Sequence, residues 1–159
     1  MTETQYLDVL IQSQKKKLLL LNKISVLNTK QRKLLEQEEM DPEEFEANVN
    51  EKDTLVAEIV QLDAGFDEVY ARLKAVIETN RSLYSDQLQT MQDLIRQIMA
   101  KDVAIRAEES RNYTLAQKKF SKIKQQVRQV KTSSKMVGQY YRNMMGLQNG
   151  DSHFMDNKK

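Results

Sequence analysis

The sequence predicts an all-α protein: an elongated antiparallel three-helix bundle or coiled coil with a short C-terminal amphipathic helix. Only 4 glycines and 1 proline occur in 159 residues, too few for the turns of a β-rich fold. Charged residues make up 30% of the chain, and the helix-favouring Leu, Gln, Glu, Lys and Ala are abundant. Breaks at Met40–Asp41 and Asn80–Ser82 divide the helical part into three segments.

The first helix is expected to run from about Thr4 to Glu39. Its apolar residues recur at spacings near three and four, as on the buried face of an amphipathic helix. They are Leu7, Leu10, Leu20, Leu21, Ile24, Leu27, Leu34 and Leu35. Polar residues interrupt the row, so a mixed rather than a dry helix contact is expected. These are Gln14, Lys17, Asn28 and Gln31.

The stretch "EEMDPEEF" predicts the start of the second helix. Asp41 is the expected N-cap, Pro42 takes the first helical position and Glu44 the third. The helix should continue to about Thr79, and Gly65 within it should mark a close helix crossing or a slight bend. Its expected buried residues are Phe45, Val49, Val56, Ile59, Phe66, Tyr70, Leu73 and Ile77.

The third helix is expected to begin near Ser82, after a turn or cap at Asn80 or Ser82. It should continue to Val130 without Gly or Pro, a length on the order of 70 Å. Its expected apolar residues are Tyr84, Leu88, Met91, Leu94, Ile95, Ile98, Ile105, Leu115, Phe120, Ile123 and Val127.

The hydroxyl-rich stretch "KTSSK" at 131–135 predicts the end of the bundle, because such residues favour turns and caps. The expected organisation is therefore a helical bundle at 1–131 and an amphipathic binding segment at 132–146. A polar tail at 147–159 is expected to be disordered.

The C-terminal segment carries the predicted partner-binding surface. On a helix, its apolar and aromatic residues fall at spacings of three and four and form one face. Methionine adds an adaptable apolar surface, and four of the eight methionines lie in the last 24 residues. The predicted partner-binding residues are Met136, Val137, Tyr140, Tyr141 and Met144. The alternative, that this face folds back as ordinary core, stays open.

Charge is strongly segregated along the chain. Residues 36–58 hold ten acidic residues and one basic, whereas 110–150 hold nine basic residues and no acid. If the helices are antiparallel, the level of Pro42 is reached again near Lys118. The basic end of the third helix should then lie beside the acidic first turn, and the two blocks should screen each other.

An electrostatic footprint for nucleic acid is the competing interpretation of the basic block. Only Tyr113 and Phe120 could stack on bases within 111–135, and no motif of a nucleic-acid-binding fold accompanies them. The sequence therefore argues against a nucleic-acid partner.

Sequence motifs for catalysis, cofactors and metals are lacking. There is no cysteine, and the single histidine, His153, falls in the expected tail. No phosphate-binding glycine loop, nucleophile elbow or EF-hand loop occurs. No catalytic residue, cofactor or metal ligand is therefore predicted. The longest apolar run, Leu18–Leu21, is far shorter than a membrane span, and a cytoplasmic protein is expected.

Several stretches together resemble FlgN-type flagellar export chaperones, over about residues 6–141. A leucine-rich first helix is followed by "LLEQEEMDPEEFEANVNEKDTLVAEIVQLD", with Glu51 and Lys52 ahead of leucine-type heptads. The late "VGQYY" is similar to the small-residue-plus-tyrosine ending of such chaperones. The basic stretch after Lys118 has no counterpart in the family pattern.

This resemblance implies a cytoplasmic helical bundle that binds the C-terminal helices of hook–filament junction proteins. It would keep them from premature assembly and bring them to the export gate and its ATPase components, without membrane insertion. The related FliT-type chaperones serve the filament cap protein, and the sequence does not separate the two types. The C-terminal segment would bind cargo, and Tyr140 or Tyr141 is the candidate gate contact.

Two other functions stay open. One is a structural coiled-coil or adaptor protein without chaperone activity. The weaker one is a nucleic-acid-binding helical protein.

Overall fold

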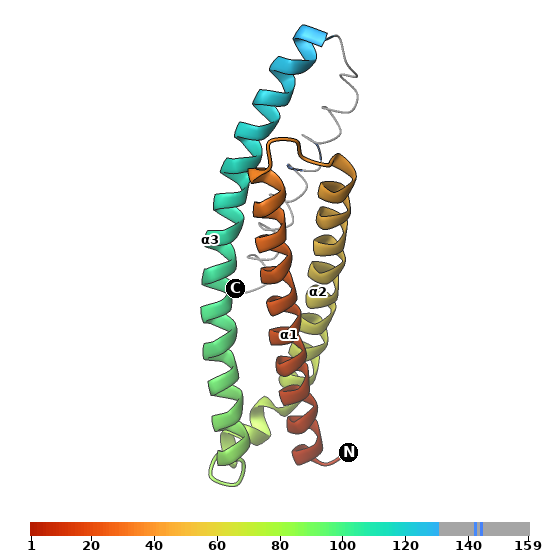
Figure 1. Cartoon of the computed structure of the whole chain (residues 1–159). Helices are drawn as coiled ribbons and strands as arrows, with labels where there is room; N and C mark the ends of the chain where they lie inside the picture. Colours follow the sequence, from red (N-terminus) through yellow and green to blue (C-terminus); the bar gives the residue numbers. More distant parts are fainter. Residues whose placement is uncertain (131–141, 143, 145–159) are drawn as a thin grey trace.

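The computed structural model describes residues 1–130 together with Arg142 and Met144. It contains three long helices, α1 (Glu3–Glu36), α2 (Pro42–Thr79) and α3 (Ser85–Val130), and no strand within the described part (Figure 1). The predicted all-helical bundle is confirmed. The predicted C-terminal amphipathic helix and disordered tail fall outside the described residues, apart from Arg142 and Met144.

The two ends of α1 follow from local hydrogen bonding. The Thr2 side chain caps the helix, and the Gln5 side-chain oxygen accepts a bond of 2.8 Å from the Thr2 backbone N–H, which completes a capping box. The helix ends at Glu36, three residues before the predicted end, and Gln37 has an extended backbone. Glutamates are unfavourable at the negative end of a helix dipole, so the acidic run beyond Glu36 disfavours further turns.

The start of α2 is as predicted, because the Asp41 carboxylate accepts a bond of 3.0 Å from the Glu43 N–H and Pro42 takes the first position. The start of α3 lies three residues later than predicted. Residues 80–84 form a turn instead, in which the Leu83 N–H donates to Asn80 and the Tyr84 N–H to Arg81.

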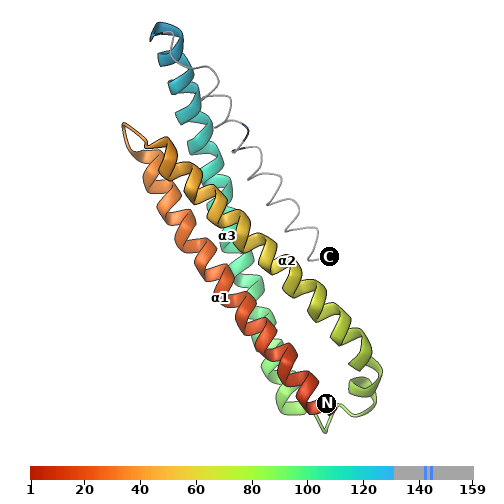
Figure 2. The same cartoon turned by 90° about the vertical axis from the view of Figure 1, so that its right-hand side faces the viewer.

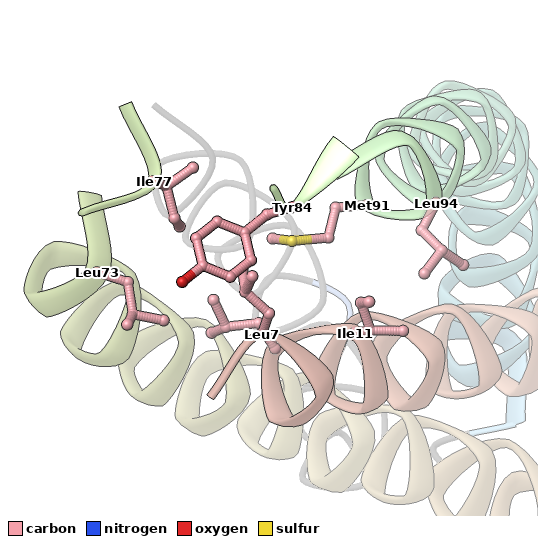
Figure 3. Packing of buried hydrophobic residues seen from close by; sticks show 8 residues of the cluster. Leu7, Ile11, Leu73, Ile77, Tyr84, Met91 and Leu94 are labelled. Carbon is pink, nitrogen blue, oxygen red and sulfur yellow. The ribbon is translucent and has the colours of Figure 1, made fainter. Parts of the chain in front are cut away.

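Three apolar clusters form the core along the bundle. The first lies at the α2–α3 connection, where Tyr84 packs among Leu7, Ile77 and Met91 (Figure 3). The second lies at mid-length and includes Leu21, Ile59, Ile98 and Ile105. The third lies near the α1–α2 connection and consists of Leu35, Phe45, Val49, Ala116, Phe120 and Met144.

The predicted core is largely confirmed. Every apolar residue predicted for the buried face of α1 is buried. One prediction is wrong, because Tyr70 is 37% exposed. Ile95, one of the apolar residues expected in the third helix, is 43% exposed. The predicted close helix crossing at Gly65 is also wrong, because a Cβ atom there would meet nothing within 4 Å. The alternative expectation of a slight bend stays a prediction.

The first helix holds the bundle together. α1 packs against both α2 and α3 and lies between them in Figure 1. The backbones of α2 and α3 do not come within 8 Å of each other, Cα to Cα, anywhere along 42–79 and 85–130. These two helices therefore meet through side chains alone.

The last turns of α3 pass the α1–α2 connection, as both views show (Figure 1, Figure 2). The Lys119 ammonium donates to the backbone carbonyl of Glu38 at 2.8 Å and to that of Gln37. The predicted level of the first turn, near Lys118, is thus confirmed. The contact runs to backbone carbonyls and not to the carboxylates of the connection.

Within the described residues, none of the helices has an apolar stretch long enough to cross a membrane.

Candidate functional site

A groove runs between α2 and α3, with α1 as its floor. It encloses a cavity of about 530 Å³. We call it the α2–α3 groove; its lining includes Gln14 and Lys17 of α1, Asp63 and Phe66 of α2, and Ile95, Met99 and Val103 of α3. The cavity exists because the backbones of its two walls stay apart while both rest on α1.

The α3 wall of this groove exposes a row of large apolar side chains. Ile95, Met99 and Val103 are 43%, 61% and 68% exposed and follow one another at intervals of four residues. Residues four apart lie on one face of a helix, so the three form a continuous strip over two turns. On the α2 wall, Phe66 is half-buried and stacks on Tyr70 at a ring distance of 6.0 Å. Large contiguous apolar patches are uncommon on monomeric proteins, so this strip is the candidate interaction surface.

Charged groups accompany the apolar strip. Lys17 and Asp63 form an ion pair of 2.7 Å inside the groove, with side chains 13% and 18% exposed. Asp67 and Arg106 line the same cavity and are exposed, so the groove offers both signs of charge. This mixed lining suits an amphipathic segment better than a purely apolar ligand.

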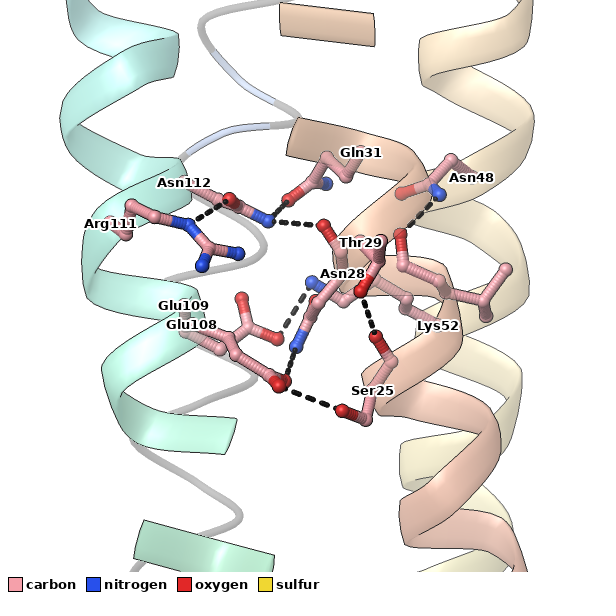
Figure 4. Close-up of polar contacts among 11 residues, drawn as sticks. Ser25, Asn28, Thr29, Gln31, Asn48, Lys52, Glu108, Glu109, Arg111 and Asn112 are labelled. Atoms are coloured by element: carbon pink, nitrogen blue, oxygen red, sulfur yellow. Dashed lines mark hydrogen bonds and ion pairs between the residues drawn. The ribbon is translucent and has the colours of Figure 1, made fainter. Parts of the chain in front are cut away.

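A buried polar layer crosses the bundle between the groove and the third cluster (Figure 4). The Asn112 amide of α3 donates to the Asn28 carbonyl at 2.9 Å and to the Gln31 side chain at 3.1 Å, both on α1. One turn away, Glu108 accepts bonds from Ser25 at 2.7 Å and Asn28 at 3.1 Å. Sliding α3 along α1 would break these buried hydrogen bonds, so this layer sets the register of α3 against α1.

The same layer contains a direct link between α2 and α3. The Lys52 ammonium, 2% exposed, lies 2.6 Å from a Glu109 carboxylate oxygen (Figure 4). Desolvation raises the pKa of the neighbouring Asp53 carboxyl, although that residue keeps an exposed surface. Lys52 lowers this pKa in turn and Glu109 raises it. The Lys52–Glu109 pair spans the two walls between the groove and the third cluster.

Beyond the polar layer, Met144 of the C-terminal segment contacts the core. Its side chain is 4% exposed and packs in the third cluster, where Phe45 and Phe120 meet edge to face at 5.7 Å. A thioether fits such aromatic surroundings well. A residue of the C-terminal segment therefore packs against residues of α1, α2 and α3.

The other predicted partner-binding residues, Met136, Val137, Tyr140 and Tyr141, lie outside the described residues. Sequence reasoning missed Met99 and Val103. The signal that could have identified them is the width of the apolar arc on α3. The exposed Met99 and Val103 widen the apolar arc formed by Leu94, Ile98 and Ile105. That arc is broader than α1, the one helix whose backbone packs against α3, can cover.

Within residues 1–130, Arg142 and Met144, no group of three His, Cys, Asp or Glu side chains could hold a metal ion. Comparison with known proteins gave no match, whether with family models, curated sequences or solved structures. The α2–α3 groove is therefore the feature from which a function can be inferred.

Proposed function

We propose that this protein is a cytoplasmic flagellar type III export chaperone that holds the C-terminal helix of a hook–filament junction protein in the α2–α3 groove. Delivery of that cargo to the export gate completes the proposed function, in line with the resemblance to FlgN-type chaperones. The observation that carries the proposal is the exposed apolar strip of Ile95, Met99 and Val103 on the wall of an open groove.

The proportions of the groove favour a helix as the occupant. The strip from Ile95 to Val103 extends over about 12 Å of helix axis, which matches two turns of a partner helix. A partner with apolar anchors at i, i+3 or i+4 and i+7 would cover it and complete a four-helix bundle on α1. Charged groups beside its apolar face would meet the mixed lining around Asp67 and Arg106.

The C-terminal segment 132–146 has a role in this proposal. The buried Met144 supports it, because an apolar side chain from that segment already packs in a cluster with residues of α2 and α3. The segment would extend the cargo surface or exchange with cargo, and Tyr140 or Tyr141 would contact the gate. Ordering such a segment costs several kcal/mol, which keeps affinity moderate and release feasible.

The groove is tested by placing a charge in its apolar strip. We expect Val103→Glu to weaken capture of the cargo helix by about tenfold or more, because a carboxylate would lose water on docking. Val26→Glu is the matched control. Val26 is also a helical valine, 69% exposed where Val103 is 68% exposed, but it lies outside the groove lining. The measurement is titration calorimetry with C-terminal helices of junction and cap proteins from the same genome.

Equal losses in Val103→Glu and Val26→Glu, or none in either, would place the binding surface elsewhere. A full affinity for cap helices and none for junction helices would move the assignment to the FliT type. Absence of binding to every such helix by the unaltered protein would reject the export-chaperone proposal.

The C-terminal segment is tested by truncation after Lys131. We expect the bundle to stay folded, because the first two clusters lie within the retained residues, but to melt earlier as Met144 leaves the third cluster. Cargo pulldown should fall sharply. Tyr140→Ala and Tyr141→Ala should each weaken the binding free energy for one partner by about 2 kcal/mol, as truncation of aromatic hot-spot residues does.

Met144→Ala separates the two effects of the truncation. It should reproduce the earlier melting while leaving Tyr140 and Tyr141 in place. If the tyrosine variants instead melt as early as the truncated chain and bind cargo fully, the segment serves as core and not as a partner surface.

A further inference from the structure

The end of α3 beyond the α1–α2 connection is a basic projection, defined here by Lys118, Lys122, Lys124 and Arg128. All four side chains are exposed. No acidic residue occurs between Ser110 and Gly150, so nothing in the nearby sequence offsets their charge. Four exposed cations within eleven residues repel one another and favour an anionic partner.

The adjoining α1–α2 connection has the opposite charge. Residues 36–46 contain seven acidic residues and no basic one. We call the exposed ones beyond α1 the acidic connection: Glu38, Glu39, Asp41, Glu43 and Glu44. One molecule therefore displays a positive and a negative surface side by side at the same end.

Within residues 1–130, the structure shows no ion pair between these two surfaces. Lys119 reaches the connection, but its ammonium donates to the backbone carbonyls of Gln37 and Glu38 and not to a side-chain carboxylate of the connection. From there α3 continues to Val130, about 17 Å further along its axis.

We propose that the occupant of both surfaces is a second copy of this chain, bound end to end about a two-fold axis. In that arrangement each basic projection lies along the acidic connection of the other copy. A two-fold axis repeats the contact, so both projections and both connections are used and the assembly closes at two copies. Because α3 continues past the α1–α2 connection, the overhanging ends of the two copies would lie side by side.

The chemistry around the projection disfavours the other anionic partners. Phosphates of a nucleic acid, or anionic lipid headgroups, would meet the acidic connection beside the basic projection and be repelled. The nearby aromatic residues, Tyr113 and Phe120, pack in or against the third cluster and are not free to stack on bases. Ile123 packs against the same cluster, which takes from the projection the apolar face that a membrane-bound helix needs.

An interface of this kind has a distinct character. It consists of exposed charges on a small area, so it should be weak and should dissociate as salt screens it. It also leaves the α2–α3 groove open, because Val103 lies about 28 Å along α3 from Lys122. The dimer does not depend on the proposed chaperone function, and either can fail without the other.

The test is sedimentation equilibrium of the full chain at about 50 mM and about 500 mM salt. We expect a concentration-dependent dimer at low salt, with an association constant at least about tenfold smaller at high salt. Two charge-reversed proteins are then compared at low salt. One carries Lys122→Glu, Lys124→Glu and Arg128→Glu; the other carries Glu38→Lys, Glu39→Lys and Glu44→Lys. Lys119 and the N-cap Asp41 are kept in both.

Each charge-reversed protein alone should be monomeric, because both of its contacts now join like charges. An equal mixture of the two should recover the dimer, since every contact in the mixed pair again joins opposite charges. Circular dichroism checks that both are folded. If either charge-reversed protein is unfolded, glutamine replaces the same residues in both proteins. Each glutamine variant should then weaken the dimer, and mixing the two should not restore it.

The proposal is overturned if the unaltered chain stays monomeric at low salt, or if the mixture stays monomeric while both proteins are folded. A monomer that is retained on heparin would point instead to nucleic acid, and one that binds anionic vesicles to a membrane surface. Dimerisation of the first charge-reversed protein at full strength would equally exclude the projection as the interface.

Discussion

Replacing Phe120 with alanine should lower the free energy of unfolding by about 3–5 kcal/mol. The ring is fully buried and packs edge to face on Phe45 at 5.7 Å and 79°. It also contacts the rest of the third cluster, which brings together α1, α2, α3 and Met144. Because the backbones of α2 and α3 stay apart, the cavity left by the ring cannot close through a small helix shift.

Urea unfolding followed by circular dichroism measures this loss. Val26→Ala is a suitable control, because that valine is 69% exposed and its truncation should change stability by about 0.5 kcal/mol or less. A loss below about 1 kcal/mol for Phe120→Ala would contradict the packing of the third cluster.

Replacing Lys52 with methionine should also destabilise strongly, by about 3 kcal/mol, toward the low end of the range for a broken buried ion pair. The change removes the partner 2.6 Å from Glu109, whose side chain is only 15% exposed. The remaining exposure of Glu109 lets some water reach the carboxylate, which moderates the cost. Methionine keeps the length of the lysine stem, so the loss of charge dominates.

A double variant separates the ion pair from packing. Lys52→Met combined with Glu109→Leu should recover most of the stability, because a well-packed apolar pair often replaces a buried ion pair without loss. Arg72→Met is the matched control, since the Arg72–Glu68 pair on α2 is about 70% exposed and should contribute little. If Lys52→Met proves as mild as Arg72→Met, the Lys52 side chain is not held in the core.

The helices and most of the core could be predicted because their causes are local. The N-cap Asp41 with Pro42 fixes the start of α2 by hydrogen bonding and by the φ preference of proline. The apolar row predicted for α1 follows the helical period, and each of its members is buried. The helix ends were less accurate, since the acidic run after Glu36 and the turn at residues 80–84 depend on weaker preferences.

The groove could not be predicted, because it depends on which part of an apolar arc another helix covers. Spacing places Ile95 beside Ile98 on α3, yet one is 43% exposed and the other buried. The buried state of Lys52 was equally hidden, since its partner Glu109 is remote in sequence. The interruptions at Asn28 and Gln31 did predict a polar contact, but not its partner, Asn112.

The position of α1 between two helices that share no backbone contact has a consequence for native-state fluctuations. If α2 detaches, it breaks its packing on α1 and its side-chain contacts with α3, the Lys52–Glu109 pair and the Phe45–Phe120 ring contact. The hydrogen bonds between α1 and α3 stay intact. If α3 detaches instead, the packing between α1 and α2 stays intact. The molecule thus has two openings that can occur one at a time, and α1 amides stay protected in either. In hydrogen exchange, α1 should report global unfolding, whereas α2 and α3 should each exchange through a partial opening of lower free energy.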